Sequence, residues 1–205
     1  LVIPAYIYRN REMHDVVLFG ELLAIAAIVM CLLFVMVDIG RPDRFWHMMP
    51  FVGEFNFPSS MLAWDVVVLF GYLLVNLHIC GYLLYMKYLG RTPTLLFYMP
   101  FVIISIAWAI SIHTVTAFLL ATILARPMWH HSMMPIRFIV TAFAAGPCLI
   151  ILIFQIIRKN TKLWIQDEAI DLLSVIVTWC LGMALFLTLS EVVIDLYART
   201  EHANG

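Results

Sequence analysis

The chain has few charged residues and few cysteines, and each shortage excludes a class of protein. Asp, Glu, Lys and Arg make up 12% of the 205 residues, and the formal net charge is −1. There is therefore no excess of positive charge for a nucleic-acid surface. The four cysteines, Cys31, Cys80, Cys148 and Cys180, stand alone within apolar stretches. Without a CxxC, CxxCH or zinc-type spacing, the sequence predicts no iron–sulfur cluster, haem attachment or disulfide framework.

Hydrophobic residues make up 64% of the chain, and the mean hydropathy is +0.98. Soluble domains average about 45–50%. A membrane-spanning helix needs about 20 apolar residues. Five segments qualify, at about residues 16–39, 61–85, 97–124, 136–157 and 170–196. We therefore predict an all-α protein, a polytopic transmembrane bundle that forms a single domain over residues 1–205.

Short polar segments separate these spans. Gly40-Arg41-Pro42-Asp43 ends the first, and Pro58-Ser59-Ser60 offers an N-cap for the second. Pro100 is expected in the first turn of the third span. The chain begins with an apolar stretch at Leu1, so we expect a piece of a longer protein that lacks at least one earlier helix.

The distribution of Lys and Arg gives an expected orientation. With five spans, one side of the membrane carries seven of these residues and the other five. The side with more is expected to be cytoplasmic. We therefore expect the opposite side, which also holds His130 and His131, to be periplasmic, in a bacterial or archaeal inner membrane.

Ionisable groups within spans cost about 2.5–3.5 kcal/mol each at the helix centre, so each is a functional candidate. His113 lies well inside the third span, with Thr116 beside it on the helix. Tyr72 and Asn76 each fall within about 20° of Asp65 on the second span, counting about 100° per residue. Such a polar stripe either joins helices or lines a proton route, and the sequence does not decide between them.

Further candidates lie toward the ends of the spans. Glu191, Asp195 and Thr188 share a face near the end of the fifth span. Glu21 and His78 are expected near the opposite membrane surface. Each of these two is either a solvated interfacial group or part of a proton relay.

The densest ionic cluster runs from Asp38 to Trp46. It holds two acids and two arginines, Asp38, Arg41, Asp43 and Arg44, at a predicted helix end. One interpretation is an ion-pair turn that sets the loop shape. The other is a docking face for a partner and the mouth of a ligand site, since Arg–carboxylate pairs are geometrically specific.

Several motifs together resemble the NrfD family, the membrane subunits of polysulfide-reductase-type complexes. Asp38-Ile39-Gly40-Arg41-Pro42 followed by Arg44-Phe45-Trp46 is similar to that family's signature. Four more segments resemble the DsrP and Hmc-type branch of sulfur-metabolising bacteria: Phe19 to Leu23, Ala63 to Val66, Ser111 to Phe118 and Ala144 to Pro147. The resemblance covers nearly the whole chain.

The resemblance implies a quinone-interacting subunit of a respiratory electron-transfer complex. Such a subunit exchanges electrons between menaquinol and an extrinsic periplasmic ferredoxin-like iron–sulfur subunit, without a haem or cluster of its own. The expected catalytic residues are His113, Asp65 and Glu191. The expected quinone contacts are Asp38, Arg41, Arg44, Thr116 and Tyr72. Glu21, Asn76 and His78 form the expected proton route.

Other functions compete with this one. A cytochrome b subunit needs axial histidines at matching depth on two helices, and His78 and His113 are expected at different depths. A multi-span transporter or channel predicts broken spans and paired repeats. Pro100 and Gly146-Pro147 are the candidate breaks. A purely structural membrane anchor is the remaining interpretation.

Overall fold

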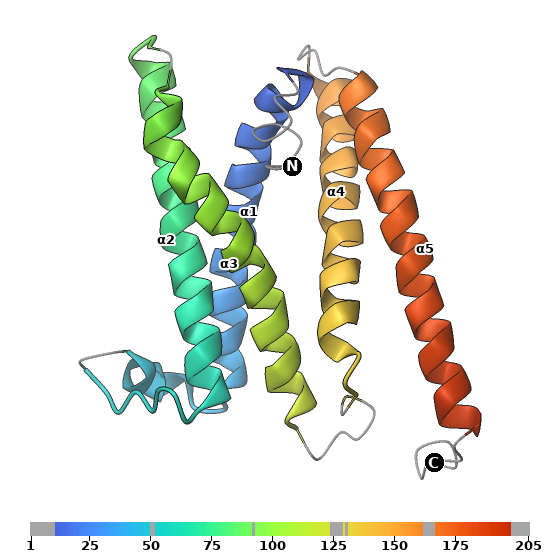
Figure 1. The fold of residues 1–205 in the computed structure, drawn as a ribbon. Coiled ribbons are helices and arrows are strands. Elements are labelled where there is room, and N and C mark those ends of the chain that lie inside the picture. Colours follow the sequence, from blue (N-terminus) through green and yellow to red (C-terminus); the bar gives the residue numbers. More distant parts are fainter. Residues whose placement is uncertain are drawn as a thin grey trace. The chain divides into compact units, whose positions relative to one another are not determined.

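The structure of the chain is a computed structural model that describes residues 11–49, 52–91, 93–123, 129, 131–161 and 167–197. The side chains of residues 11–16, 95 and 195 lie outside this description. Within these ranges every regular element is helical (Figure 1). The elements are α1 (Arg11–Asp38), the 3₁₀ helix η2 (Pro42–Met48), α2 (Met61–Tyr88), α3 (Leu95–Ala121), α4 (Met134–Asn160) and α5 (Asp167–Tyr197).

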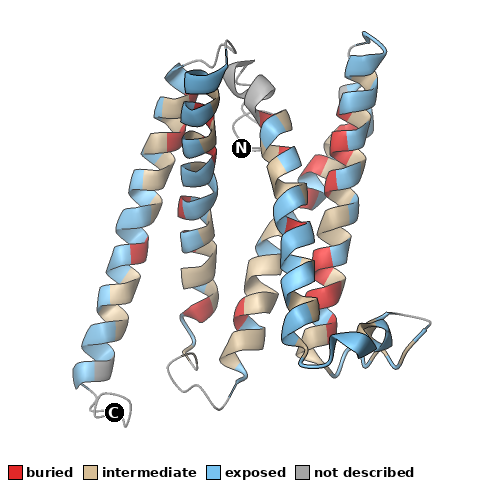
Figure 2. Cartoon of the chain, turned by 180° about the vertical axis from the view of Figure 1, so that it is seen from behind, coloured by how far each residue is buried: buried red, intermediate tan, exposed pale blue. Residues whose placement is uncertain are grey.

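All five α-helices are long and apolar enough to cross a membrane. The candidate spans are Val17–Asp38, Met61–Tyr88, Leu96–Ala121, Met134–Asn160 and Asp167–Ile194. Large apolar side chains are exposed along every helix, including Phe34 at 61% and Phe186 at 70% (Figure 2). A surface of this kind is stable against lipid tails and costly in water. The predicted all-α bundle with about five membrane-spanning helices is confirmed.

The helix ends differ from the predicted bounds by a few residues. The third helix begins at Leu95 and ends at Ala121, so Pro100 lies inside it and not in its first turn as predicted. Ser60 occupies the N-cap position of α2, but its side chain makes no capping hydrogen bond. The predicted stop at Gly40 is present, and its φ of 78° is readily available only to glycine.

Contacts divide the chain into two compact units, residues 1–116 and 117–205, and each is described by itself. The expectation of a single domain stays a prediction. In the first unit α1 lies along α2 in the antiparallel sense (Figure 1). In the second unit α4 packs against α5, also antiparallel, and the Arg158 guanidinium pairs with Asp167 Oδ1 at 2.6 Å where one helix gives way to the next.

Trp108 joins α3 to α2. Its indole Nε1 donates a hydrogen bond to the backbone carbonyl of Val68 at 2.8 Å. The same ring lies directly against Gly71, where an added Cβ would stand 2.3 Å from ring carbon Cζ2. Because the indole is rigid, only a residue without a side chain allows this approach. The contact therefore fixes the register of α3 along α2.

We predict that Gly71→Ala destabilises the protein. The added methyl collides with the Trp108 ring, and overpacking of this kind costs about 1–3 kcal/mol. Gly81→Ala, on the same helix, is the matched control, because nothing lies within 4 Å of its added Cβ. Thermal unfolding in detergent should show a lower Tm for Gly71→Ala and an unchanged or higher Tm for Gly81→Ala. Equal midpoints would contradict the assigned role of the Trp108 contact.

Candidate functional site

Asp65 is a buried carboxyl on a membrane-spanning helix. It lies in the second turn of α2 with its residue surface 2% exposed. The Thr116 hydroxyl on α3 donates a hydrogen bond to Asp65 Oδ1 at 2.7 Å. Both were predicted site residues, and the structure brings them together although they are 51 positions apart. A buried polar group must be bonded to be tolerated, and this contact supplies that bond.

His113 lies on α3 one turn before Thr116. At about 100° per residue the two side chains are about 60° apart around the helix, so they share one side of α3. The imidazole is half-buried, and it makes no hydrogen bond or ion pair with the described residues. A neutral imidazole offers one donor and one acceptor near neutral pH. His113 therefore holds unused hydrogen-bonding capacity on the side of α3 that carries Thr116.

The predicted polar stripe on α2 faces the protein. Asn76 is 1% exposed and donates from Nδ2 to the backbone carbonyl of Tyr72 at 2.7 Å. Tyr72 is half-buried. From Asp65 to Asn76 the stripe extends about 16 Å along the helix axis, at about 1.5 Å per residue. This is about half the thickness of the hydrocarbon core.

Of the three residues of the predicted proton route, His78 is turned away from the other two. Glu21 is 4% exposed on α1, and its Oε2 has no hydrogen-bond partner. His78 is two residues beyond Asn76, about 200° around α2. Its ring packs on α3, with centroids 4.2 Å from Phe101 and 5.7 Å from Phe97. His78 therefore lies on another side of α2 from Asn76.

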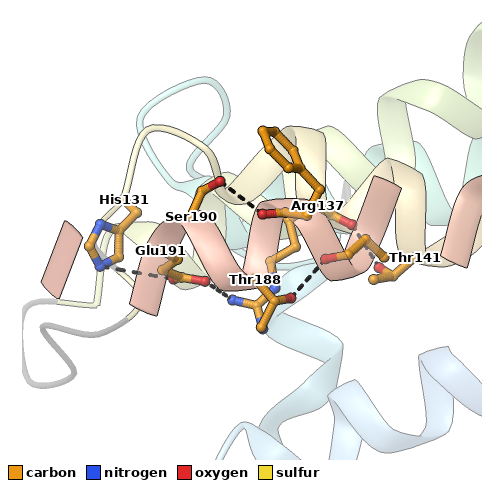
Figure 3. Close-up of polar contacts among 8 residues, drawn as sticks. His131, Arg137, Thr141, Thr188, Ser190 and Glu191 are labelled. Atoms are coloured by element: carbon orange, nitrogen blue, oxygen red, sulfur yellow. Dashed lines mark hydrogen bonds and ion pairs between the residues drawn. The ribbon is translucent and has the colours of Figure 1, made fainter. Parts of the chain in front are cut away.

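Glu191 belongs to the second unit, where it forms an ion pair. The Arg137 guanidinium on α4 donates to Glu191 Oε2, and His131 Nε2 lies 4.0 Å from Oε1 (Figure 3). The predicted neighbour Thr188 instead donates to the Ala184 carbonyl of its own helix at 2.9 Å. Of the other predicted residues here, His130 and the side chain of Asp195 lie outside the described residues.

Arg137 was not predicted as a site residue. Its charge was counted as an interfacial cation beside the start of a helix. The signal for pairing was a basic residue near the beginning of one span and an acid near the end of the next. In an antiparallel helix pair these two positions lie side by side.

The Asp38 to Arg44 segment is a turn without ion pairs. Asp38, Arg41, Asp43 and Arg44 are all exposed, and the structure shows no salt bridge among these four described side chains. The interpretation as an ion-pair turn is therefore wrong. Pairing between exposed charges gains little against solvent and side-chain entropy, which explains why the arginines stay unpaired. Two solvated guanidinium groups remain available at this end of α1.

The loop that follows is held by backbone packing and aromatic contacts. Gly53 lies against the backbone of His47, and Trp64 Nε1 donates to the Pro58 carbonyl at 2.9 Å. Phe57 packs on Trp64 with ring centroids 4.5 Å apart. The loop therefore has a defined shape. It lies at the same end of the α1–α2 pair as Asp65.

The first unit offers the buried carboxyl of Asp65, which is oriented by the Thr116 hydroxyl. It also offers the imidazole of His113, one turn from Thr116, which has unused hydrogen-bonding capacity. Such groups bind a polar headgroup within apolar walls and exchange protons with it. Within the described residues, no three His, Cys, Asp or Glu side chains gather as a metal site. The second unit offers the charged pair of Arg137 and Glu191, near His131.

Comparison with known proteins gives a family. The family model described as "Polysulphide reductase, NrfD" matches residues 1–204. One of the subunits of the selenate reductase of Mesobacillus selenatarsenatis is 23% identical over 232 aligned residues, which cover 96% of this chain. The chain spans about half (52%) of the length of that relative. No solved structure matches the chain. With nearly all of its residues matched, this multi-pass membrane protein belongs to the polysulphide reductase NrfD family.

Proposed function

We propose that this chain is the quinone-interacting part of a membrane subunit in a respiratory reductase complex. The observation that carries the proposal is the buried Asp65–Thr116 contact between two membrane-spanning helices, with His113 one turn away. A buried carboxyl within a spanning helix is a functional candidate by default. Family membership supports the same role, because the resemblance to NrfD proteins implies binding of a lipid-soluble quinone.

The residues of the first unit fit a quinone headgroup. The headgroup needs polar partners within apolar surroundings, and the half-buried imidazole of His113 has unused donor and acceptor capacity. A bound menaquinol supplies two electrons and two protons. The proposed role of His113 is to accept a hydrogen bond and then a proton from the quinol at one ring nitrogen. Thr116 holds the Asp65 carboxyl in one orientation through the bond to Oδ1.

Tyr72 and Glu191 have separate parts in the proposal. Tyr72 is a second hydrogen-bonding group on the α2 stripe that begins at Asp65. Glu191 on α5 forms an ion pair with Arg137. Its proposed task is to accept protons at the membrane surface. Proton movement coupled to electron transfer is part of the proposal.

The proposed partner is an extrinsic periplasmic iron–sulfur subunit. The selenate reductase relative supports a multi-subunit complex, since its name places it among several subunits of one enzyme. Arg41 and Arg44, exposed and without ion pairs among the described residues, supply the docking charge. Asp38, at the end of α1, lies beside the proposed entrance to the quinone site.

We predict that Arg41→Ala weakens binding of the extrinsic subunit. The substitution removes the solvated guanidinium and with it the contact to a carboxylate of the partner. The loss costs about 0.2–1 kcal/mol for an exposed pair and more for a desolvated one. Co-purification from membranes at increasing salt measures the effect. Lys87→Ala, also an exposed cation, is the control. Assembly and activity at the wild-type level for Arg41→Ala would leave this turn with a purely structural role.

The experiment that tests the function is oxidation of a menaquinol analogue by the purified native complex. Electrons should appear on an artificial acceptor only when the quinol and the extrinsic subunit are both present. The competing function is a transporter or channel. Substrate uptake into vesicles that needs no redox partner, with no quinol oxidation, would favour that function and overturn the proposal.

A further inference from the structure

Glu21 is a carboxyl group enclosed in the α1–α2 pair with one oxygen unused. Its residue surface is 4% exposed, and no donor among the described residues reaches Oε2. Val17, one turn earlier on α1, is 1% exposed. This side of α1 therefore faces protein, although most of the helix carries exposed apolar side chains (Figure 2).

The described side chains of α2 that face Glu21 carry no positive charge. Tyr72 and Cys80 lie within electrostatic range of the carboxyl, and Asn76 shares their side of α2. No Lys, Arg or His of the described residues forms an ion pair with Glu21. Asn76 donates from Nδ2 to the Tyr72 carbonyl, so its side-chain oxygen remains as an acceptor.

An ionised carboxylate without a partner is costly in such surroundings. The desolvation cost is far larger for the charged form than for the neutral acid. Glu21 also differs from Asp65 and Glu191, the other described helix carboxyls that are not exposed, because Asp65 is bonded to Thr116 and Glu191 to Arg137.

We propose that Glu21 is a proton-binding site of the α1–α2 pair, where Oε2 takes up a proton from water and later returns it. On uptake an O–H bond of a hydronium ion breaks as the Oε2–H bond forms, which leaves water, and release reverses both changes. Asn76 offers an acceptor beside the site. Lys87 shares this side of α2 three turns further on, where the helix ends and its side chain is exposed. The site exchanges protons with that membrane surface.

This inference does not rest on the proposed redox role, because a proton can be held and exchanged without quinone or partner. It is tested by labelling native membranes with dicyclohexylcarbodiimide and mapping the adducts by peptide mass spectrometry. The O–H of a protonated carboxyl adds across the carbodiimide, and the product rearranges to a stable N-acylurea. The reagent is apolar and reaches acids within the membrane. Wild-type protein should carry the adduct on Glu21, and the yield should fall as the pH is raised.

The controls separate a buried acid from an accessible one. Glu21→Gln should lose the adduct, and Glu191, which is paired with Arg137, should stay unlabelled in the wild-type protein. A water-soluble carbodiimide should label exposed Glu168 but leave Glu21 unmodified.

An unlabelled Glu21 in correctly folded membranes, or equal labelling by the water-soluble reagent, would overturn the proposal. If Glu21→Gln does not assemble, the wild-type peptide map decides alone. A complex that fails to oxidise quinol would leave the result at Glu21 unaffected.

Discussion

His113→Ala is expected to lower the turnover of quinol oxidation by about 10²–10⁴-fold, the range typical of losing a general acid or base. The half-buried imidazole has unused hydrogen-bonding capacity one turn from Thr116, and alanine has no group that can accept a proton. Assembly should be intact, since no described residue depends on the ring for a hydrogen bond. Turnover with a menaquinol analogue, measured on the purified complex, gives the rate.

The matched control for His113 lies on the same helix. Ser111 is exposed, and its hydroxyl bonds only to the Ala107 carbonyl of its own helix at 3.0 Å. Ser111→Ala should keep both assembly and turnover. If His113→Ala turns over at the wild-type rate, the imidazole has no part in the reaction and is only a packed side chain.

Asp65→Asn is expected to reduce turnover strongly while preserving the fold. The amide oxygen of asparagine occupies the place of Oδ1 and still accepts the bond from Thr116, but the side chain cannot take up a proton. We expect a loss of about 10²-fold or more and the disappearance of one limb of the pH profile of kcat/KM. A purely structural carboxyl would leave the pH profile unchanged, so this measurement separates the two roles.

Thr116→Val distinguishes positioning from chemistry at the same contact. Valine keeps the shape but removes the donor, which leaves a buried carboxyl oxygen unsatisfied at a cost of about 1–3 kcal/mol. The Tm should therefore fall for Thr116→Val and not for Asp65→Asn. Asp171→Asn, an exposed carboxyl on α5, should change neither the Tm nor the turnover. A pH profile that keeps both limbs in Asp65→Asn would remove Asp65 from the proton chemistry.

The spans and the buried polar residues could be predicted from the sequence because the lipid environment imposes a simple rule. An apolar run of sufficient length crosses the membrane, and a polar group within it must face protein. Asp65 and Asn76 were placed on one polar stripe in this way, and both are buried. Glu21 is buried as well, although a solvated interfacial position was one of its two predicted alternatives. The helix ends were predicted less accurately. The third span was expected to begin at residue 97 with Pro100 in its first turn, whereas α3 begins at Leu95 and carries Pro100 in its second turn.

The pairing of residues could not be predicted, because it depends on the register between helices. The contact of Asp65 with Thr116 follows from the fit of the Trp108 ring against Gly71, and no pattern within one helix encodes that fit. His78 was predicted to share a proton route with Glu21 and Asn76, but its rotation on α2 directs its ring to aromatic side chains of α3.

The positions of charged residues along the sequence also did not predict which of them form ion pairs. Two acids and two arginines in one turn suggested ion pairs, yet all four side chains are solvated. The ion pair that does form joins Arg137 to Glu191 across two helices. Of the three predicted catalytic residues, Asp65 and His113 belong to the first unit and Glu191 to the second. Their joint action in one reaction stays a prediction.

The most direct test is to photolabel the native complex with an azido-substituted menaquinone and identify the modified peptides. We predict that the adducts fall on α2 near Asp65 and on α3 near His113, and that excess unlabelled quinone removes them. Adducts confined to the lipid-exposed faces of α4 and α5, unchanged by competing quinone, would contradict the assignment of a quinone site to the Asp65–Thr116 contact.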